Sequence, residues 1–213
     1  MKIGIIDYGV GNLGSIFNAL KTLSANPIFI QRPEDLRSAD GLILPGVGNY
    51  SDCFRLISEG RWIDSIKDEV SGSQRPLLGI CVGMQMLGDS SSERSRPNDE
   101  ESRGLGLIPG TVQHLREMGC TLRIPHVGWN SVNSIEQKDG LFRGIPDGTD
   151  FYFVHSYGFM PTDQKDILAT VNHEIPITAA VHRDNVWGTQ FHPEKSSRAG
   201  FRLIRNFVAT CRC

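Results

Sequence analysis

Short apolar runs alternate with amphipathic stretches over the first 90 residues of the chain. Four runs have the length of strands: 2–7, 27–30, 41–44 and 76–80. Apolar residues at helical spacing follow over 13–23, 52–70 and 82–87. Strands that alternate with helices in this way predict an α/β fold built on a parallel sheet.

The pattern changes after residue 88. The serine-rich, charged segment 89–103 lacks periodicity, which predicts a surface loop without a catalytic role. A hairpin that turns at Asp184–Asn185 and a terminal helix over 198–210 are expected further on. We find no repeat or linker, so residues 1–213 are expected to form a single domain. Further strands are predicted near Thr111 and Leu122, and over 151–154, 167–171, 178–181 and 186–191.

Composition excludes several classes of protein. A net charge of -2 and 22% charged residues are typical of a globular protein and argue against a nucleic-acid partner. The chain begins without a signal-peptide pattern and has no apolar run near the ~20 residues of a membrane span, so we expect a cytoplasmic protein without membrane contact. Its five cysteines lack CxxC spacing, which argues against a disulfide framework or a zinc site.

A glycine-rich segment follows the first predicted strand. Residues 9–14 (GVGNLG) match the G-x-G-x-x-G dinucleotide fingerprint in the expected strand-to-helix context. The acidic residue that should follow ~20 positions later is replaced by Gln31-Arg32, and Arg32 suits a 2'-phosphate. An NADP-dependent oxidoreductase is therefore one alternative. A plain turn and a protein-contact loop are the others.

Cys81 has the strongest chemical signal in the sequence. It lies between Gly79 and Gly83, directly after an apolar run and directly before a helical pattern. A sharp strand-to-helix turn that exposes a nucleophile needs glycines at these two positions, because neighbouring side chains have no room. The start of a helix also favours the thiolate form. An inert core cysteine is the competing interpretation.

Two further segments supply what a cysteine nucleophile needs. His192 ends a predicted strand, and Glu194 lies two residues on, where its carboxylate can hold the imidazole in the tautomer that serves the thiol. The glycine-rich bend 44–48 can turn a backbone N–H toward the same place, where the N–H of Val82 would complete an oxyanion hole. These segments predict a Cys-His-Glu hydrolase site.

Together these motifs resemble the glutaminase subunit of imidazole glycerol phosphate synthase, within the class I glutamine amidotransferases. The segments that carry the resemblance are GICVGMQ, HPEKSS, PGVGNY, PHVGWN and FYFVHSY. It implies a flavodoxin-like domain with a mostly parallel central sheet flanked by helices. It also implies that Cys81 attacks L-glutamine, that His192 protonates the departing ammonia, and that no cofactor or metal is needed. Val47 would supply the second oxyanion N–H once the Gly46–Val47 peptide has reoriented.

The resemblance also implies a partner. In the family, ammonia passes to a (β/α)₈ barrel cyclase in a 1:1 heterodimer of histidine biosynthesis, and the free glutaminase is almost silent. The implied substrate residues are Gly48, Gln85, Ser156 and Tyr157, and the implied interface residues are Asn12, Pro125, Trp129 and Lys195. Trp129 could equally be a core residue. A paralogue that serves a sugar amidotransferase in surface-polysaccharide synthesis would carry similar motifs, and a non-catalytic binding module is a further alternative.

Overall fold

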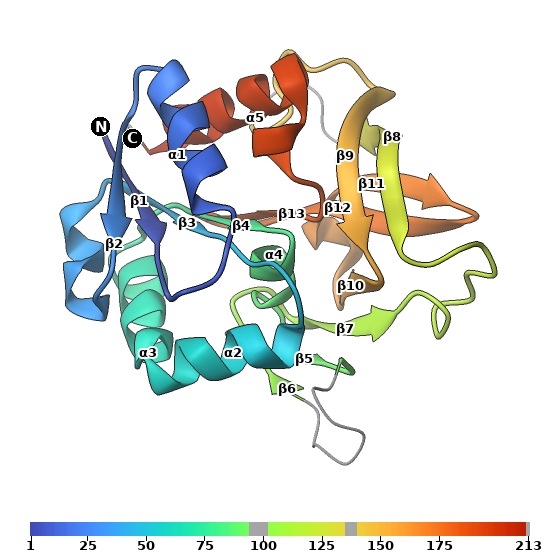
Figure 1. The fold of residues 1–213 in the computed structure, drawn as a ribbon, viewed down its shortest axis with the longest axis horizontal. Coiled ribbons are helices and arrows are strands. Elements are labelled where there is room, and N and C mark those ends of the chain that lie inside the picture. The colour runs from blue at the N-terminus through green and yellow to red at the C-terminus, as the bar shows by residue number, and fades with distance from the viewer. Residues whose placement is uncertain (94–101, 135–139, 212–213) are drawn as a thin grey trace.

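The computed structural model describes residues 1–93, 102–134 and 140–211. Within them, nine strands form a central sheet with helices on both faces (Figure 1). No helix in these ranges combines the length and apolar character that a membrane crossing needs. In sheet order the strands are β2 (Asn26–Ile30), β1 (Lys2–Ile6), β3 (Gly41–Leu44), β4 (Leu77–Ile80), β13 (Val186–Thr189), β12 (Ile175–Arg183), β11 (Ile167–His173), β8 (His126–Ser134) and β9 (Thr149–His155).

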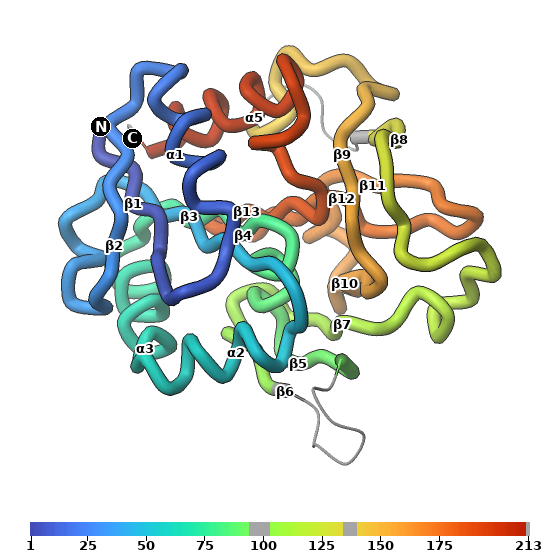
Figure 2. The backbone as a smooth tube through the Cα atoms, viewed as in Figure 1, coloured from blue at the N-terminus to red at the C-terminus, as the bar shows by residue number. Residues whose placement is uncertain are grey.

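Helices α1 (Leu13–Thr22) and α5 (Ser197–Thr210) cover one face of this sheet, and α2 (Tyr50–Glu59) and α3 (Trp62–Lys67) lie on the other (Figures 1 and 2). The short helix α4 (Val82–Gln85) follows β4. Short 3-10 helices are η1 (Pro33–Ser38), η3 (Gln164–Asp166) and η4 (Pro193–Lys195), and η2 (Asp68–Gly72) is a short π-helix. A smaller sheet contains β10 (Tyr157–Pro161), β7 (Gly110–His114), β5 (Ser90–Ser91) and β6 (Ser102–Arg103).

The central sheet has a parallel half and an antiparallel half. Strands β2, β1, β3, β4 and β13 pair in parallel, whereas β13 to β9 pair in antiparallel fashion. The parallel strands are covered on both faces and therefore read as continuous apolar runs, as in β3, where all four residues are buried. Their order is that of a flavodoxin-like sheet, and the predicted α/β fold class is confirmed.

Most elements lie where the apolar pattern predicted them, but the helix over 52–70 and the strand near Leu122 were predicted wrongly. The helical stretch expected over 52–70 is broken, because Gly60 ends α2 and Arg61 adopts a left-handed φ of 59° before α3. Leu122 is not in a strand. Its backbone N–H donates instead to the carboxylate of Glu174, at 3.1 Å, which satisfies the group without a strand partner.

Strand β8 was not predicted as a strand. Its residues alternate between a buried face, with His126 at 4% exposure, and an exposed face that carries Val127 and Trp129. Apolar side chains on the exposed face hide the hydrophobic-polar alternation by which a half-buried strand is recognised. Trp129 is 54% exposed, so the alternative that it belongs to the core is wrong.

The turn from β4 into α4 depends on unusually close backbone contacts. A Cβ atom placed on Gly83 would lie 1.9 Å from the carbonyl oxygen of Leu44 at the end of β3. A Cβ atom on Gly79 would lie 2.6 Å from the carbonyl oxygen of Gly83. Real Cβ atoms do not approach oxygen so closely, and backbone cannot yield as a flexible side chain can. Both positions therefore require glycine, as the sequence predicted.

Replacing Gly83 by alanine should accordingly destabilise the fold by about 3 kcal/mol, because the added methyl group forces β3 and α4 apart. Gly14→Ala is the matched control, since a Cβ there meets nothing within 4 Å and alanine favours the helix by up to ~1 kcal/mol. Urea unfolding of both variants measures the difference. Equal effects of the two substitutions would contradict the packing account.

Candidate active site

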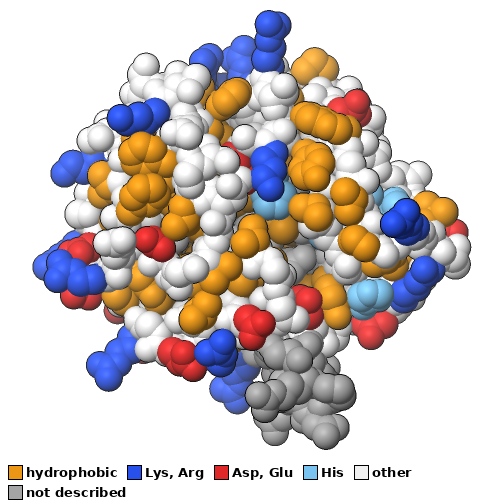
Figure 3. Space-filling view, viewed as in Figure 1, with side chains coloured by type: hydrophobic (Ala, Val, Ile, Leu, Met, Phe, Trp, Pro, Cys, Tyr) orange, Lys and Arg blue, Asp and Glu red, His pale blue; other side chains and the backbone are white. Residues whose placement is uncertain are grey.

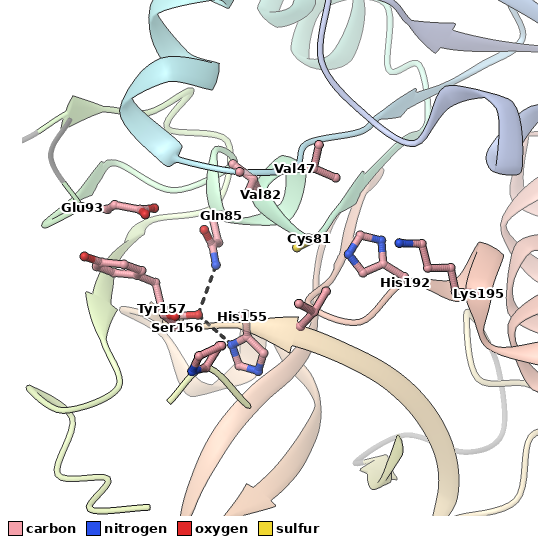
Figure 4. A pocket seen from close by; sticks show the side chains of 13 residues that line it. Val47, Cys81, Val82, Gln85, Glu93, His155, Ser156, Tyr157, His192 and Lys195 are labelled. Atoms are coloured by element: carbon pink, nitrogen blue, oxygen red, sulfur yellow. Dashed lines mark hydrogen bonds between the residues drawn. The ribbon is translucent and has the colours of Figure 1, made fainter. Parts of the chain in front are cut away.

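Three neighbouring parallel strands end at one place. Leu44 of β3 pairs with Gly79 of β4, and Ile80 pairs with Thr189 of β13, so the segments that follow these strands emerge side by side. In open α/β sheets this edge is where ligands bind. A pocket of about 360 Å³ lies there (Figure 4). Its lining is Val47, Gly48, Cys81, Val82, Gln85, Glu93, Pro125, Val154, His155, Ser156, Tyr157, His192 and Lys195.

Cys81 occupies the turn between β4 and α4 in a strained conformation. Its φ of 56° and ψ of -113° lie in a region that residues with a side chain rarely adopt. The conformation is held because the N–H of Cys81 donates to the carbonyl of Thr189 at 2.7 Å and the flanking glycines pack against backbone. The predicted helix 82–87 is shorter than expected and ends at Gln85, so α4 contributes only one turn.

His192 faces the same pocket and is paired with Glu194. The Nδ1 atom of His192 lies 2.9 Å from Oε1 of Glu194, and the two side chains are 2% and 0% exposed. Burial opposes a positive charge on His192, but its hydrogen bonds and charge interactions with Cys81 and Glu194 outweigh burial and raise its pKa to about 9. At neutral pH the imidazole is therefore protonated.

The glycine-rich segment after β1 contributes to this pair. The Nδ2 atom of Asn12 donates to Oε1 of Glu194 at 3.1 Å, across 182 positions of sequence. Asn12 was expected only at a partner interface, and its contact with Glu194 was not predicted. A Cβ atom on Gly14 would meet nothing within 4 Å, whereas the third glycine of a dinucleotide fingerprint serves close helix–strand packing. The open space around Gly14 therefore argues against an NADP-dependent oxidoreductase.

The other predicted pocket residues are gathered around the thiol. Gly48, Gln85, Ser156 and Tyr157 line the pocket, as do Val47 and Val82, the two residues expected to supply oxyanion N–H groups. Of the expected interface residues, Pro125 and Lys195 also belong to the lining. Trp129 lies outside it on β8, where its ring is 6.1 Å from that of Tyr152.

Glu93 is the pocket residue that sequence reasoning missed. It belongs to the serine-rich segment 89–103, of which residues 94–101 lie outside the described ranges. The N–H of Tyr50 donates to its carboxylate at 3.0 Å, and the Ser51 hydroxyl donates to its backbone carbonyl at 2.6 Å. Burial raises the pKa of the Glu93 carboxyl. In Figure 4 Glu93 and Tyr157 lie at the end of the pocket opposite His192.

A second group of histidines borders the pocket and has the opposite electrostatic character. His126 Nδ1 lies 2.9 Å from His155 Nε2, and the rings of His126 and His173 are stacked at 4.2 Å. Burial lowers the pKa of His155 to about 3, and burial together with the charge of His173 lowers the pKa of His126 to about 4. At neutral pH both imidazoles are therefore neutral, whereas that of His192 is charged.

Comparison with known proteins now defines the class. Residues 4–211 match the family described as glutamine amidotransferase class-I, and the chain belongs to that family. Within it, the chain is 44% identical to the imidazole glycerol phosphate synthase subunit HisH 2 of Vibrio vulnificus, over 98% of this chain and 94% of the relative. The subunit HisH of Halalkalibacterium halodurans is 43% identical, with 97% and 95% covered. The resemblance proposed from the motifs is confirmed.

The fold agrees with solved structures as well. The crystal structure of a glutamine amidotransferase superposes with a TM-score of 0.75 and 20% sequence identity, covering 99% of both chains. At this identity the likeness concerns the fold alone.

The neutral histidines predict how stability depends on pH. The unfolded chain protonates them near pH 6.5, whereas in the fold the pKa of each is lower, so the stability they contribute is present above pH 6.5 and lost as pH falls toward 4. The slope should be about 1.4 kcal/mol per pH unit for each histidine. Urea unfolding between pH 7 and 5 should show a slope smaller by that amount in His126→Gln.

His182→Gln is the control for this experiment, because His182 lies on β12 and stacks on Trp187, away from the pair. Parallel stability curves for wild type and His126→Gln would contradict the assignment of neutral, buried imidazoles.

Proposed function

We propose that this protein hydrolyses L-glutamine to glutamate and ammonia, with Cys81 as nucleophile, His192 as acid and base, and Glu194 as the group that orients His192. One observation carries the proposal: a strained, glycine-flanked cysteine shares its pocket with a histidine that is buried against a carboxylate at 2.9 Å. Activation of a thiol by an adjacent imidazolium is how cysteine hydrolases work at neutral pH.

The reaction follows from the protonation states. A thiolate at Cys81, the form that a neighbouring imidazolium favours, attacks the carboxamide carbon of glutamine and forms a tetrahedral oxyanion. His192 then gives its proton to the departing nitrogen, ammonia leaves, and a γ-glutamyl thioester remains. The now neutral His192 takes a proton from water, which attacks the thioester and releases glutamate and the thiol. Asn12 and Glu194 keep the imidazole in place throughout.

The oxyanion is assigned to the N–H groups of Val82 and Val47. Two hydrogen bonds hold the ends of this bend: the Tyr8 hydroxyl donates to the Pro45 carbonyl at 2.8 Å, and the Cys53 thiol donates to the Val47 carbonyl at 3.3 Å. The Gly46–Val47 peptide lies between these two anchored peptides. This arrangement supports the expectation that it can reorient while its neighbours stay fixed. The low activity expected of the free chain belongs to the same proposal.

The pocket is suited to a substrate that carries both charges of an amino acid. We assign the α-ammonium group of glutamine to Glu93, the half-buried carboxylate at the far end of the pocket from His192. The α-carboxylate is assigned to the backbone at Ser156 and Tyr157. Gln85 lies between these groups and the thiol (Figure 4), and Gly48 lines the same pocket, so the carboxamide of the substrate is directed to Cys81.

We further propose that ammonia passes to a (β/α)₈ barrel cyclase in a 1:1 heterodimer, which makes imidazole glycerol phosphate and an aminoimidazole carboxamide ribotide for histidine biosynthesis. The names of the relatives support this destination. Val127 and Val154 face each other across β8 and β9, next to Trp129 and Tyr152, and form an exposed apolar patch. The patch adjoins the pocket through Val154 and Lys195, whose Nζ lies 6.0 Å from the Tyr152 ring.

Figure 3 shows hydrophobic side chains gathered on the face of the molecule that carries β9. Pro125 and Lys195 at the pocket mouth, with Trp129 and Asn12 near it, are assigned to the interface with the cyclase, because ammonia must travel from the thiol to its acceptor without entering bulk water. A single domain over residues 1–213 and a cytoplasmic location belong to the same proposal.

Glutamate release tests the catalytic assignment. Wild type alone should be nearly inactive and should be stimulated by a cyclase partner with its nucleotide substrate, whereas Cys81→Ala should lose activity on the order of 10⁴-fold. Cys120→Ala, a buried cysteine outside the pocket, is the matched control and should remain active. Stimulation only by a sugar-amidating partner would keep the glutaminase assignment and replace histidine biosynthesis as the destination of the ammonia. No activity with either partner would contradict the proposal.

Glu93→Gln tests substrate recognition. Loss of a charged hydrogen bond to the α-ammonium should raise the KM for glutamine about 10- to 100-fold and leave kcat within a few-fold of wild type. Glu117→Gln makes the same change of charge nearby, where the carboxylate accepts from Ser92 and His114 outside the pocket lining. If both variants changed KM equally, a general field effect would replace the specific contact.

A further inference from the structure

Gln190 is a buried polar residue in contact with the nucleophile that the mechanism above does not use. It follows β13, two residues before His192, and is 0% exposed. Its carboxamide lies between two pocket residues: Nε2 is 3.7 Å from Sγ of Cys81, and Oε1 is 2.9 Å from Nε2 of Gln85. The residue bridges the thiol and a predicted substrate residue.

The hydrogen-bond network fixes which end of this carboxamide faces the sulfur. Nε2 of Gln85 lies 3.2 Å from the backbone carbonyl of Tyr157, and a carbonyl can only accept (Figure 4). The amide nitrogen of Gln85 must therefore point toward Tyr157 and Gln190. The side-chain oxygen of Gln190 must then be the acceptor of the hydrogen bond from Gln85. Its nitrogen is left facing Cys81, so an N–H donor is aimed at Sγ.

The Tyr157 carbonyl is held from a second side. Nδ1 of His155 lies 2.8 Å from the same oxygen and must carry a proton. Because Nδ1 is the protonated nitrogen of this neutral imidazole, Nε2 accepts from Nδ1 of His126. Nε2 of His126 in turn accepts from Nδ2 of Asn130, which is oriented by the Asn172 carbonyl at 2.9 Å. One assignment of donors and acceptors is therefore consistent with all the hydrogen bonds of this chain, from Asn130 on β8 to the thiol.

We propose that Gln190 is a further positioning residue of the active site, whose N–H group holds Sγ of Cys81 and stabilises its thiolate. The proposal rests on the assignment of Cys81 as the nucleophile. A hydrogen bond to an ionised group is stronger than one to its neutral form, so the donor favours the reactive state. Acceptance of the Gln85 N–H by Oε1 polarises the carboxamide and strengthens donation at Nε2. The contact also fixes the sulfur relative to Gln85.

The pH dependence of Cys81 alkylation tests this role without substrate or partner. Iodoacetamide is applied across pH, and modification of the Cys81 peptide is followed by mass spectrometry. In Gln190→Met, which keeps the length of the side chain but lacks the donor, the midpoint of the rate profile should move upward by about one pH unit. Partner-stimulated kcat/KM at neutral pH should fall about tenfold.

Two variants separate this role from a merely structural one. Gln190→Asn keeps the carboxamide but shortens its reach, and should shift the midpoint in the same direction. It also serves if Gln190→Met does not fold. Asn206→Leu removes a buried amide of similar kind from α5, which donates to the Leu141 and Arg143 carbonyls, and should leave the midpoint unchanged.

An unshifted midpoint in folded Gln190→Met or Gln190→Asn, or an equal shift in Asn206→Leu, overturns the role of Gln190. Failure of the proposed function looks different: Cys81 of wild type would then be alkylated no faster than partly buried Cys211 at neutral pH.

Discussion

The close approach of Gly83 to the end of β3 is the constraint on which this site depends. Because no side chain intervenes, the turn after β4 can fold back against the Leu44 carbonyl and hold Cys81 at a φ of 56°. The strain is sustained by buried parallel strands on both sides, whose apolar packing exceeds the ~1–3 kcal/mol that such a conformation costs.

Electrostatics then divide the histidines around the pocket into two kinds. His192 is charged because a carboxylate and a thiol face it, and His126 and His155 are neutral because burial prevails where no carboxylate is paired with them. The charged one is assigned to proton transfer, and the neutral pair forms a fixed hydrogen-bond chain in which His126 donates to His155 and His155 donates to the Tyr157 carbonyl. Histidine side chains are thus assigned to catalysis at one wall of the pocket and hold the backbone in place at the other.

Sequence patterns predicted those features that depend on neighbouring residues. The strands of the parallel half follow from apolar runs, and the turn at Cys81 follows from glycines two positions before and after it. His192 and Glu194 were recognisable because they lie two residues apart. Glu93 was not, since its place in the pocket depends on contacts with Tyr50 and Ser51, 43 and 42 positions away, within a segment that has no periodicity. Gln190 and Gln85 meet across 105 positions, which no local pattern encodes.

Trapping the nucleophile as a stable covalent adduct is the most direct test that Cys81 attacks glutamine. A diazoketone analogue of glutamine, bound in place of the substrate, alkylates the nucleophile, and tandem mass spectrometry then locates the added mass. The account predicts a single modification at Cys81, promoted by the partner, suppressed by excess glutamine and absent from Cys81→Ala. Modification of another residue in protein that is hydrolysing glutamine, or hydrolysis that persists in Cys81→Ala, would contradict it.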